Sequence, residues 1–159
     1  MTAMAEATSQ LSLDLEAVSR ALQAVHKEIL EAEGMLLPGR GGSGLLDRLV
    51  NDPEWAWLRA LSKQIADLDE ALAAPAELTP GDAAAAAGHV RALVFGLGEP
   101  RDEPFLNRYR PLLQESVALA SAHGELKRLL DALPPEPENA SEKLHARHVW
   151  AMRCKHRAR

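Results

Sequence analysis

Residues 51–72 read NDPEWAWLRALSKQIADLDEAL, and they combine a helix start signal with a regular apolar spacing. Asn51 or Asp52 can cap the start of a helix, and Pro53 suits the first helical turn because its missing N–H would be unpaired there. Apolar side chains then recur at steps of three and four, which is the spacing of one buried helical face. These side chains are Leu58, Leu61, Ile65, Leu68 and Leu72. The pattern predicts an amphipathic helix over residues 53–73.

A second apolar stripe lies upstream and alternates steps of four and three over three heptads. Its members are Leu11, Leu15, Val18, Leu22, Val25 and Ile29. Gly34 follows in the position typical of a helix C-terminus, so we expect a helix that begins near Ser9 or Ser12 and ends at Glu33. At 1.5 Å per residue the stripe is about 27 Å long. Another long helix must therefore cover it, either from within the chain or from a partner.

Composition supports a purely helical chain of one domain. The 159 residues are 47% apolar, much of this alanine and leucine, while residues that favour strands are scarce. We expect an all-α fold: an antiparallel helical bundle of four main helices plus a short helix and a basic C-terminal tail. The main helices are predicted at about 9–33, 53–73, 79–97 and 104–133, and the short helix at about 43–50.

The predicted boundaries follow proline, glycine and charge. Residues 1–9 are expected to be a flexible leader, 10–133 the bundle domain, 134–140 a proline-rich spacer and 141–159 a basic tail that is disordered or forms a loosely attached short helix. We interpret residues 38–44 as a flexible loop.

Four further residues are predicted to shape the later helices. Thr79 and Pro80 begin the third helix, and Gly98 closes it. Pro111 is predicted to bend or break the fourth.

Charge is distributed unevenly along the chain. Six cations and no acid fall in residues 143–159, so with 18 cations and 23 acids in total the first 142 residues carry a net charge of −11. The six cations are Lys143, Arg147, Arg153, Lys155, Arg157 and Arg159. An acidic body repels nucleic acid, so any role in nucleic-acid or anionic-surface binding falls to the tail. Val149, Trp150 and Met152 add an apolar patch that can dock on the acidic body of the same or a second chain.

The expected cellular location follows from segments that the sequence lacks and from its single cysteine. No apolar run approaches the roughly 18–20 residues of a membrane span, and the first residues lack the pattern of a secretory signal. Cys154 is the only cysteine, which excludes an internal disulfide and fits a reducing compartment. We therefore expect a cytoplasmic protein.

Residues 52–62 carry a resemblance to a known group. They contain the pattern D-P-x-x-x-W-L-R-x-L-S downstream of a helix with the dipeptide His26-Lys27. In this the chain resembles, over about residues 15–72, a group of small uncharacterised proteobacterial proteins. The resemblance implies a compact helical fold and carries no activity.

Motifs for cofactors, metals and catalysis are weak. Residues 39–44 match G-x-G-x-x-G, but a helix rather than a strand precedes them, so we interpret them as a loop. The tail residues His145, His148, Cys154 and His156 lack the usual spacing of a zinc site, and a single E-x-x-H at Glu142 does not make a dinuclear centre. We predict no cofactor and no metal, identify no catalytic residue, and expect a protein that is not an enzyme.

Candidate binding residues lie in two groups. Trp55, Trp57 and Arg59 form the first, in which Trp57 is predicted to pack in the core and Trp55 at its edge, where it can contact a partner. His26, Tyr109 and His123 are the polar candidates of the interior.

These groups support three functional hypotheses. We expect an interaction module that self-associates, as a dimer, or binds a protein helix. The alternative is a small-molecule or enzymatic site in the interior around His26, Tyr109, His123 and Trp57. The third is binding of nucleic acid or an anionic surface by the tail.

Overall fold

The computed structural model describes residues 2–34 and 43–157, and within these ranges the chain is all-helical with no strand, as predicted. Its α-helices are α1 (Thr2–Ala32), α2 (Ser43–Asn51), α3 (Arg59–Leu72), α4 (Pro80–Val90), α5 (Glu103–Glu115), α6 (Val117–Asp131) and α7 (Ala140–Arg157). Two 3₁₀ segments, η1 (Pro53–Leu58) and η2 (Pro75–Glu77), and a π-helical turn, η3 (Arg91–Phe95), complete the described part. The finer expectation, an antiparallel bundle of four main helices, is not confirmed. None of the described helices is long and apolar enough to cross a membrane.

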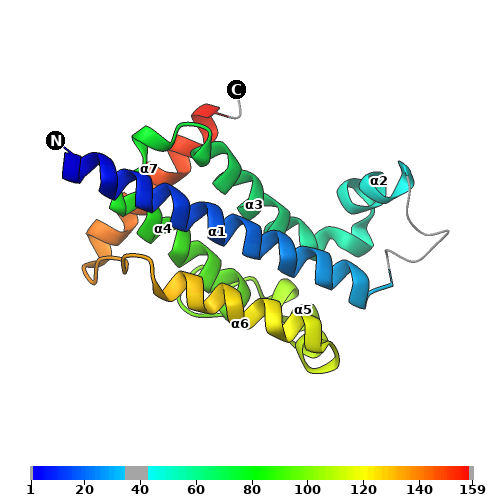
Figure 1. The fold of residues 1–159 in the computed structure, drawn as a ribbon. Coiled ribbons are helices and arrows are strands. Elements are labelled where there is room, and N and C mark those ends of the chain that lie inside the picture. The colour runs from blue at the N-terminus through cyan, green and yellow to red at the C-terminus, as the bar shows by residue number, and fades with distance from the viewer. Residues whose placement is uncertain (1, 35–42, 158–159) are drawn as a thin grey trace.

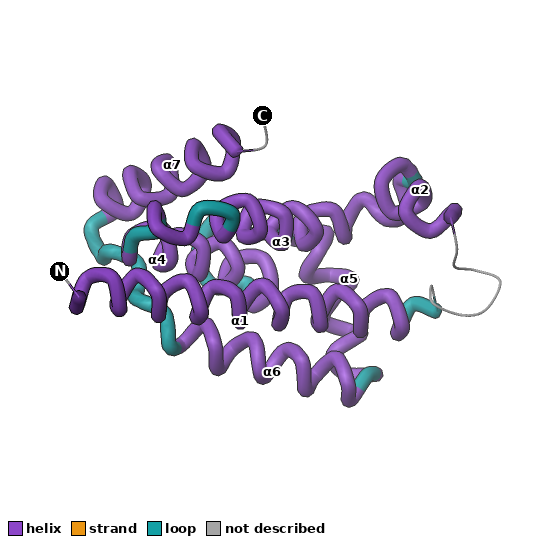
Figure 2. The backbone as a smooth tube through the Cα atoms, turned by 45° about the horizontal axis from the view of Figure 1, so that its top comes forward, coloured by secondary structure: helices purple, strands orange, loops and turns teal. Residues whose placement is uncertain are grey.

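Helix α1 organises the core. It runs the length of the molecule between α3 and α6, and both of these helices run back along it (Figures 1 and 2). All six members of its predicted apolar stripe, from Leu11 to Ile29, are buried. The stripe is therefore covered from within the chain, which was one of the two arrangements its length requires.

The N-terminal boundary of α1 differs from the prediction. The helix begins at Thr2, so residues 2–9 continue α1 instead of forming a flexible leader. Alanines alternate with other residues here, and alanine is the strongest helix former. Residues 2–7 are nevertheless exposed, because α1 extends beyond the helices that cover its stripe. Most of the loop expected at 38–44 falls outside the described residues.

The tryptophan segment begins as predicted but winds more tightly. Asp52 caps it by accepting a hydrogen bond from the Glu54 N–H at 3.0 Å, and Pro53 occupies the first turn. The segment is a 3₁₀ helix up to Leu58, and the α-helix begins only at Arg59. Tight first turns of this kind are common at helix N-termini.

Helix α4 is short and mostly buried. Thr79 and Asp82 form a reciprocal capping box, with hydrogen bonds of 3.0 and 3.1 Å, and Pro80 takes the first helical position as predicted. The five alanines 83–87 are all buried, which lets neighbouring helices approach closely. The helical path ends at Gly96, whose φ of +67° suits glycine, and not at Gly98 as expected.

The predicted break near Pro111 lies elsewhere. Pro111 stays inside α5, and the chain breaks at Ser116, where the backbone is extended with φ −114° and ψ 112°. The Ser116 hydroxyl caps α6 by accepting a hydrogen bond from the Leu119 N–H at 3.1 Å. A cap stops one helix and starts the next, whereas proline only removes one hydrogen bond.

The C-terminal segment is the largest correction. Residues 141–159 are predicted to be disordered or to form a loosely attached short helix, but residues 140–157 form α7, which packs against α4 and α3 (Figures 1 and 2). Trp150 and Cys154 are buried in this contact. The apolar patch expected in the tail thus docks on the chain's own body through Trp150, while Val149 and Met152 stay exposed.

Candidate functional site

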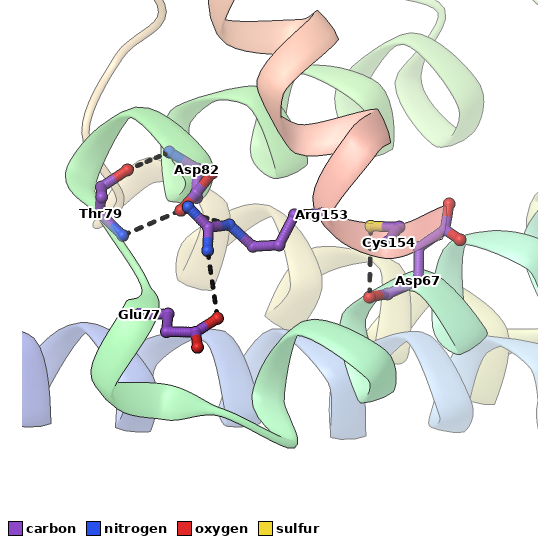
Figure 3. Close-up of polar contacts among 6 residues, drawn as sticks. All are labelled: Asp67, Glu77, Thr79, Asp82, Arg153 and Cys154. Atoms are coloured by element: carbon purple, nitrogen blue, oxygen red, sulfur yellow. Dashed lines mark hydrogen bonds and ion pairs between the residues drawn. The ribbon is translucent and has the colours of Figure 1, made fainter. Parts of the chain in front are cut away.

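Arg153 ties α7 to the start of α4 (Figure 3). Its Nε lies 3.0 Å from Asp82 Oδ2, and its Nη1 lies 3.6 Å from Glu77 Oε2. Asp82 is only 1% exposed, and the same Oδ2 accepts the Thr79 N–H of the capping box. The Nε–H does not point well at Asp82, so this contact is an ion pair without a good hydrogen bond. A buried carboxylate needs such a cation, because an unpaired charge in the interior is costly.

Arg147 makes the second link. Its Nε and Nη2 donate to the two carboxylate oxygens of Glu136 at 2.7 and 2.8 Å, and its Nη1 donates to the carbonyl oxygen of Glu99. Burial by itself would raise the pKa of Glu136, but the hydrogen bonds and charge of Arg147 outweigh it and lower that pKa. The carboxylate lies directly against Gly88 of α4, where a Cβ atom would overlap it. Arg147 and Glu136 thus form a forked, bidentate ion pair that packs against Gly88.

These contacts bear on the prediction that the tail presents a free basic surface. Arg147 and Arg153 belong to intramolecular ion pairs, Lys143 is half-buried and Lys155 is exposed. The side chains of Arg157 and Arg159 lie outside the described residues. The tail therefore does not present its predicted cations as one free basic surface, and this weighs against nucleic-acid binding.

A cavity of about 250 Å³ lies where α3, α4 and α7 meet. Its lining includes Lys63, Gln64, Asp67, His89, Trp150, Ala151, Cys154 and Lys155. The Cys154 thiol donates to the carbonyl oxygen of Asp67 at 3.6 Å (Figure 3). Burial, reinforced by the charge of Asp67, raises the pKa of that thiol to about 12, so it stays protonated. Burial and then the charge of Arg147 lower the pKa of His89.

The predicted interior residues form two separate pairs. The hydroxyl of Tyr109 and Nδ1 of His123 share a hydrogen bond at 2.8 Å, and burial raises the pKa of Tyr109 while lowering that of His123. His26 Nε2 and the Ser62 hydroxyl share another at 3.3 Å, and burial also lowers the pKa of His26. Neither pair lines the cavity between α3, α4 and α7. The first hydrogen bond satisfies the buried hydroxyl of Tyr109, whereas in the second Ser62 is exposed and His26 is half-buried.

The tryptophan group is mostly internal. Trp55 and Trp57 are both buried, with ring centroids 6.3 Å apart, and Trp57 lies 5.9 Å from the ring of Phe105. The guanidinium of Arg108 sits 5.2 Å from the Trp57 ring, in the range of a cation–π contact. Arg59 is exposed and donates to the carbonyl oxygen of Asp52 at 3.0 Å. A partner-binding role for this group stays a prediction.

An apolar groove flanks the start of α1. Two hollows of about 460 and 260 Å³ meet at Met4, whose side chain is 79% exposed. Their walls are α1 and the segment from η2 to the start of α4, with Pro75, Leu78 and Pro80 among the lining residues.

The groove and the cavity were both missed in the sequence, for different reasons. Met4 and Thr8 extend the stripe of α1 backwards at the same steps of four and three, so the groove left a signal, which the polar Thr8 obscured. The cavity around His89 left no local signal, because its residues come from three distant helices.

No group of three or more His, Cys, Asp or Glu side chains that the structure describes is arranged to hold a metal ion. The tail set that contains His145, His148 and Cys154 does not converge, since the thiol is turned inward to Asp67.

Comparison with protein-family models, with curated proteins and with solved structures finds no match to this chain. The resemblance based on the D-P-x-x-x-W-L-R-x-L-S pattern stays a prediction.

Proposed function

We propose that the protein is a non-enzymatic helical interaction module that self-associates as a dimer through the end of the molecule where α1 begins. The observation that carries this proposal is the exposure of Met4, at the point where the apolar stripe of α1 emerges from the helices that cover it. An exposed apolar side chain between two hollows is typical of an interaction surface. In this proposal, the antiparallel packing of the long helices holds this surface in place.

The outer face of α7 offers the complementary surface. Leu144, His148 and Met152 follow one another at steps of four and are exposed, on the side of the helix away from Trp150 and Cys154. The N-terminus of α1 and helix α7 lie at the same end of the molecule in both views (Figures 1 and 2). A twofold axis at this end can therefore place α1 of each copy against α7 of the other.

Charge favours the same pairing. Residues 2–19 contain Glu6, Asp14 and Glu16 and no cation, while residues 143–157 contain no acid and keep Lys143 and Lys155 outside the ion pairs of Arg147 and Arg153. Opposite charges steer two such surfaces together and disfavour pairing of α1 with α1. The apolar area is small, so the dimer is expected to be weak and reversible, as is typical of interfaces at the low end of the size range.

A cytoplasmic location accords with this function. The one cysteine, Cys154, is a free and buried thiol, as suits a reducing compartment. A dimer of this kind also needs no cofactor or metal.

Sedimentation velocity over about 10 to 500 µM protein tests the proposal, because that range brackets a weak association. The weight-average sedimentation coefficient should rise with concentration and fall again as salt is added. Met4→Glu and Met152→Glu should each weaken the association, and both residues are exposed, so neither change should unfold the chain.

Val117→Glu is the matched control. Val117 is 86% exposed and begins α6, at the end of the molecule away from the α1 N-terminus (Figure 1). The control should associate like the unaltered protein. A strict monomer at the highest concentration, or equal weakening by Val117→Glu, contradicts the proposed dimer.

A further inference from the structure

The cavity between α3, α4 and α7 has an apolar wall that self-association does not use. Trp150 and Cys154 are buried at its side and come from the inner face of α7, opposite the face assigned to the dimer. The thiol donates to the Asp67 carbonyl, so it presents sulfur and methylene to the cavity as a neutral, soft surface. An aromatic ring beside such a wall favours a planar apolar group.

The rim carries polar groups with unused hydrogen-bonding capacity. Lys155 is exposed and has no ion-pair partner among the described residues, and His89 is half-buried with no hydrogen bond to any of them. Lys63, by contrast, is held by Asp67 at 2.7 Å. The two lysines and one aspartate give the cavity a net positive charge, although the body of the protein is acidic.

We propose that this cavity binds a small organic carboxylate with a planar apolar part. The carboxylate accepts hydrogen bonds from Lys155 and His89, and the planar part lies against Trp150. The single uncompensated cation matches a monoanion better than a phosphate dianion, because the Asp67 carboxylate would repel the second negative charge. A volume of about 250 Å³ is below the roughly 300–1,000 Å³ of drug-sized pockets, so the ligand is limited to about one ring with short substituents.

Benzoate is the probe, and benzamide is its uncharged counterpart of nearly the same shape. Each is titrated into dilute ¹⁵N-labelled protein while amide cross-peaks are followed by NMR. Benzoate should shift the cross-peaks of residues 63–67, 89 and 150–155 in a saturable way, with an affinity in the millimolar range expected for so few atoms. Benzamide should shift the same peaks with at least about fivefold weaker affinity, since it lacks the charge that Lys155 recognises.

Two variants locate the carboxylate. Lys155→Gln should weaken benzoate at least about fivefold and leave benzamide unchanged, because one charge-assisted hydrogen bond is removed. Lys127→Gln removes the same charge from an exposed site on α6, where the lysine pairs with Asp131 at 3.1 Å, and should leave both titrations unchanged.

Three results overturn the proposal. They are the absence of saturable shifts at these residues, equal affinity for benzoate and benzamide, and equal loss with Lys155→Gln and Lys127→Gln. Because the titration uses dilute protein and local peaks, each of these results stands whether or not the protein self-associates.

Discussion

For Gly88→Ala, the structure predicts whether the free energy of unfolding rises or falls. Alanine in place of a glycine inside a helix ordinarily stabilises it by about 1 kcal/mol. At Gly88, however, the new Cβ would overlap the carboxylate of Glu136, which forms the forked pair with Arg147. Glu136 is a flexible side chain and can move away, but only by giving up that pair.

The cost of the lost pair can be worked from its geometry. It consists of two charge-assisted hydrogen bonds between side chains that are only 14% and 12% exposed. Such a pair contributes about 2 to 3 kcal/mol after allowance for the residual solvent contact. With about 1 kcal/mol gained from helix propensity, the net expectation is a loss of about 1 to 2 kcal/mol in the free energy of unfolding.

Urea denaturation followed by circular dichroism measures this difference. Gly124→Ala in α6 is the matched control, because an added Cβ there meets nothing within 4 Å, and it should stabilise by about 0.5 to 1 kcal/mol. In a Glu136→Ala background, Gly88→Ala should also become stabilising, which completes a double-mutant cycle. If Gly88→Ala stabilises the unaltered protein as Gly124→Ala does, the forked pair seated on Gly88 is refuted.

Other consequences follow from buried polar groups. Tyr109→Phe removes the hydrogen bond to His123 and should cost about 1 to 2 kcal/mol in urea denaturation; an unchanged midpoint would show that the bond contributes nothing. Burial lowers the pKa of His123 below its ordinary 6.5, so its contribution to stability is fully present above pH 6.5 and is lost as the pH falls through the folded-state pKa; NMR titration of the ring protons checks this, and a pKa at or above 6.5 contradicts it. Burial raises the pKa of the Cys154 thiol to about 12, so it should react with a disulfide reagent at pH 8 at least about tenfold more slowly in the folded than in the unfolded chain, and equal rates would mean an exposed thiol. Arg153→Met leaves the charge of Asp82 buried and should lower the unfolding free energy by about 2 kcal/mol; a neutral effect in urea denaturation would remove the ion pair from the account.

Features that depend on neighbouring residues were predicted well. The stripe of α1 and the caps at Asp52 and Thr79 each arise from residues that are close together in the sequence, and all appear in the structure. Spacing and capping are local properties, so a single sequence contains them.

Features that depend on distant partners were not predicted. Helix α7 is ordered because Arg147 and Arg153 form ion pairs with acids on other parts of the chain. The sequence of the tail alone does not contain these partners, so it predicts a solvated segment. The cavity beside His89 is another example, since three helices must pack before it exists. The break at Ser116 shows a smaller form of the same limit, because proline is a stronger local signal than a serine cap.

Hydrogen exchange measured by mass spectrometry at several protein concentrations separates the covered part of α1 from the part proposed to contact a second copy. The stripe from Leu11 to Ile29 is buried by the chain itself, and only residues before Leu11 are proposed to contact another molecule. We expect slow exchange in residues 11–29 at every concentration, and exchange in residues 2–10 that is fast in dilute protein and slows as the concentration rises. Fast exchange in residues 11–29, or exchange in residues 2–10 that ignores concentration, would contradict this expectation.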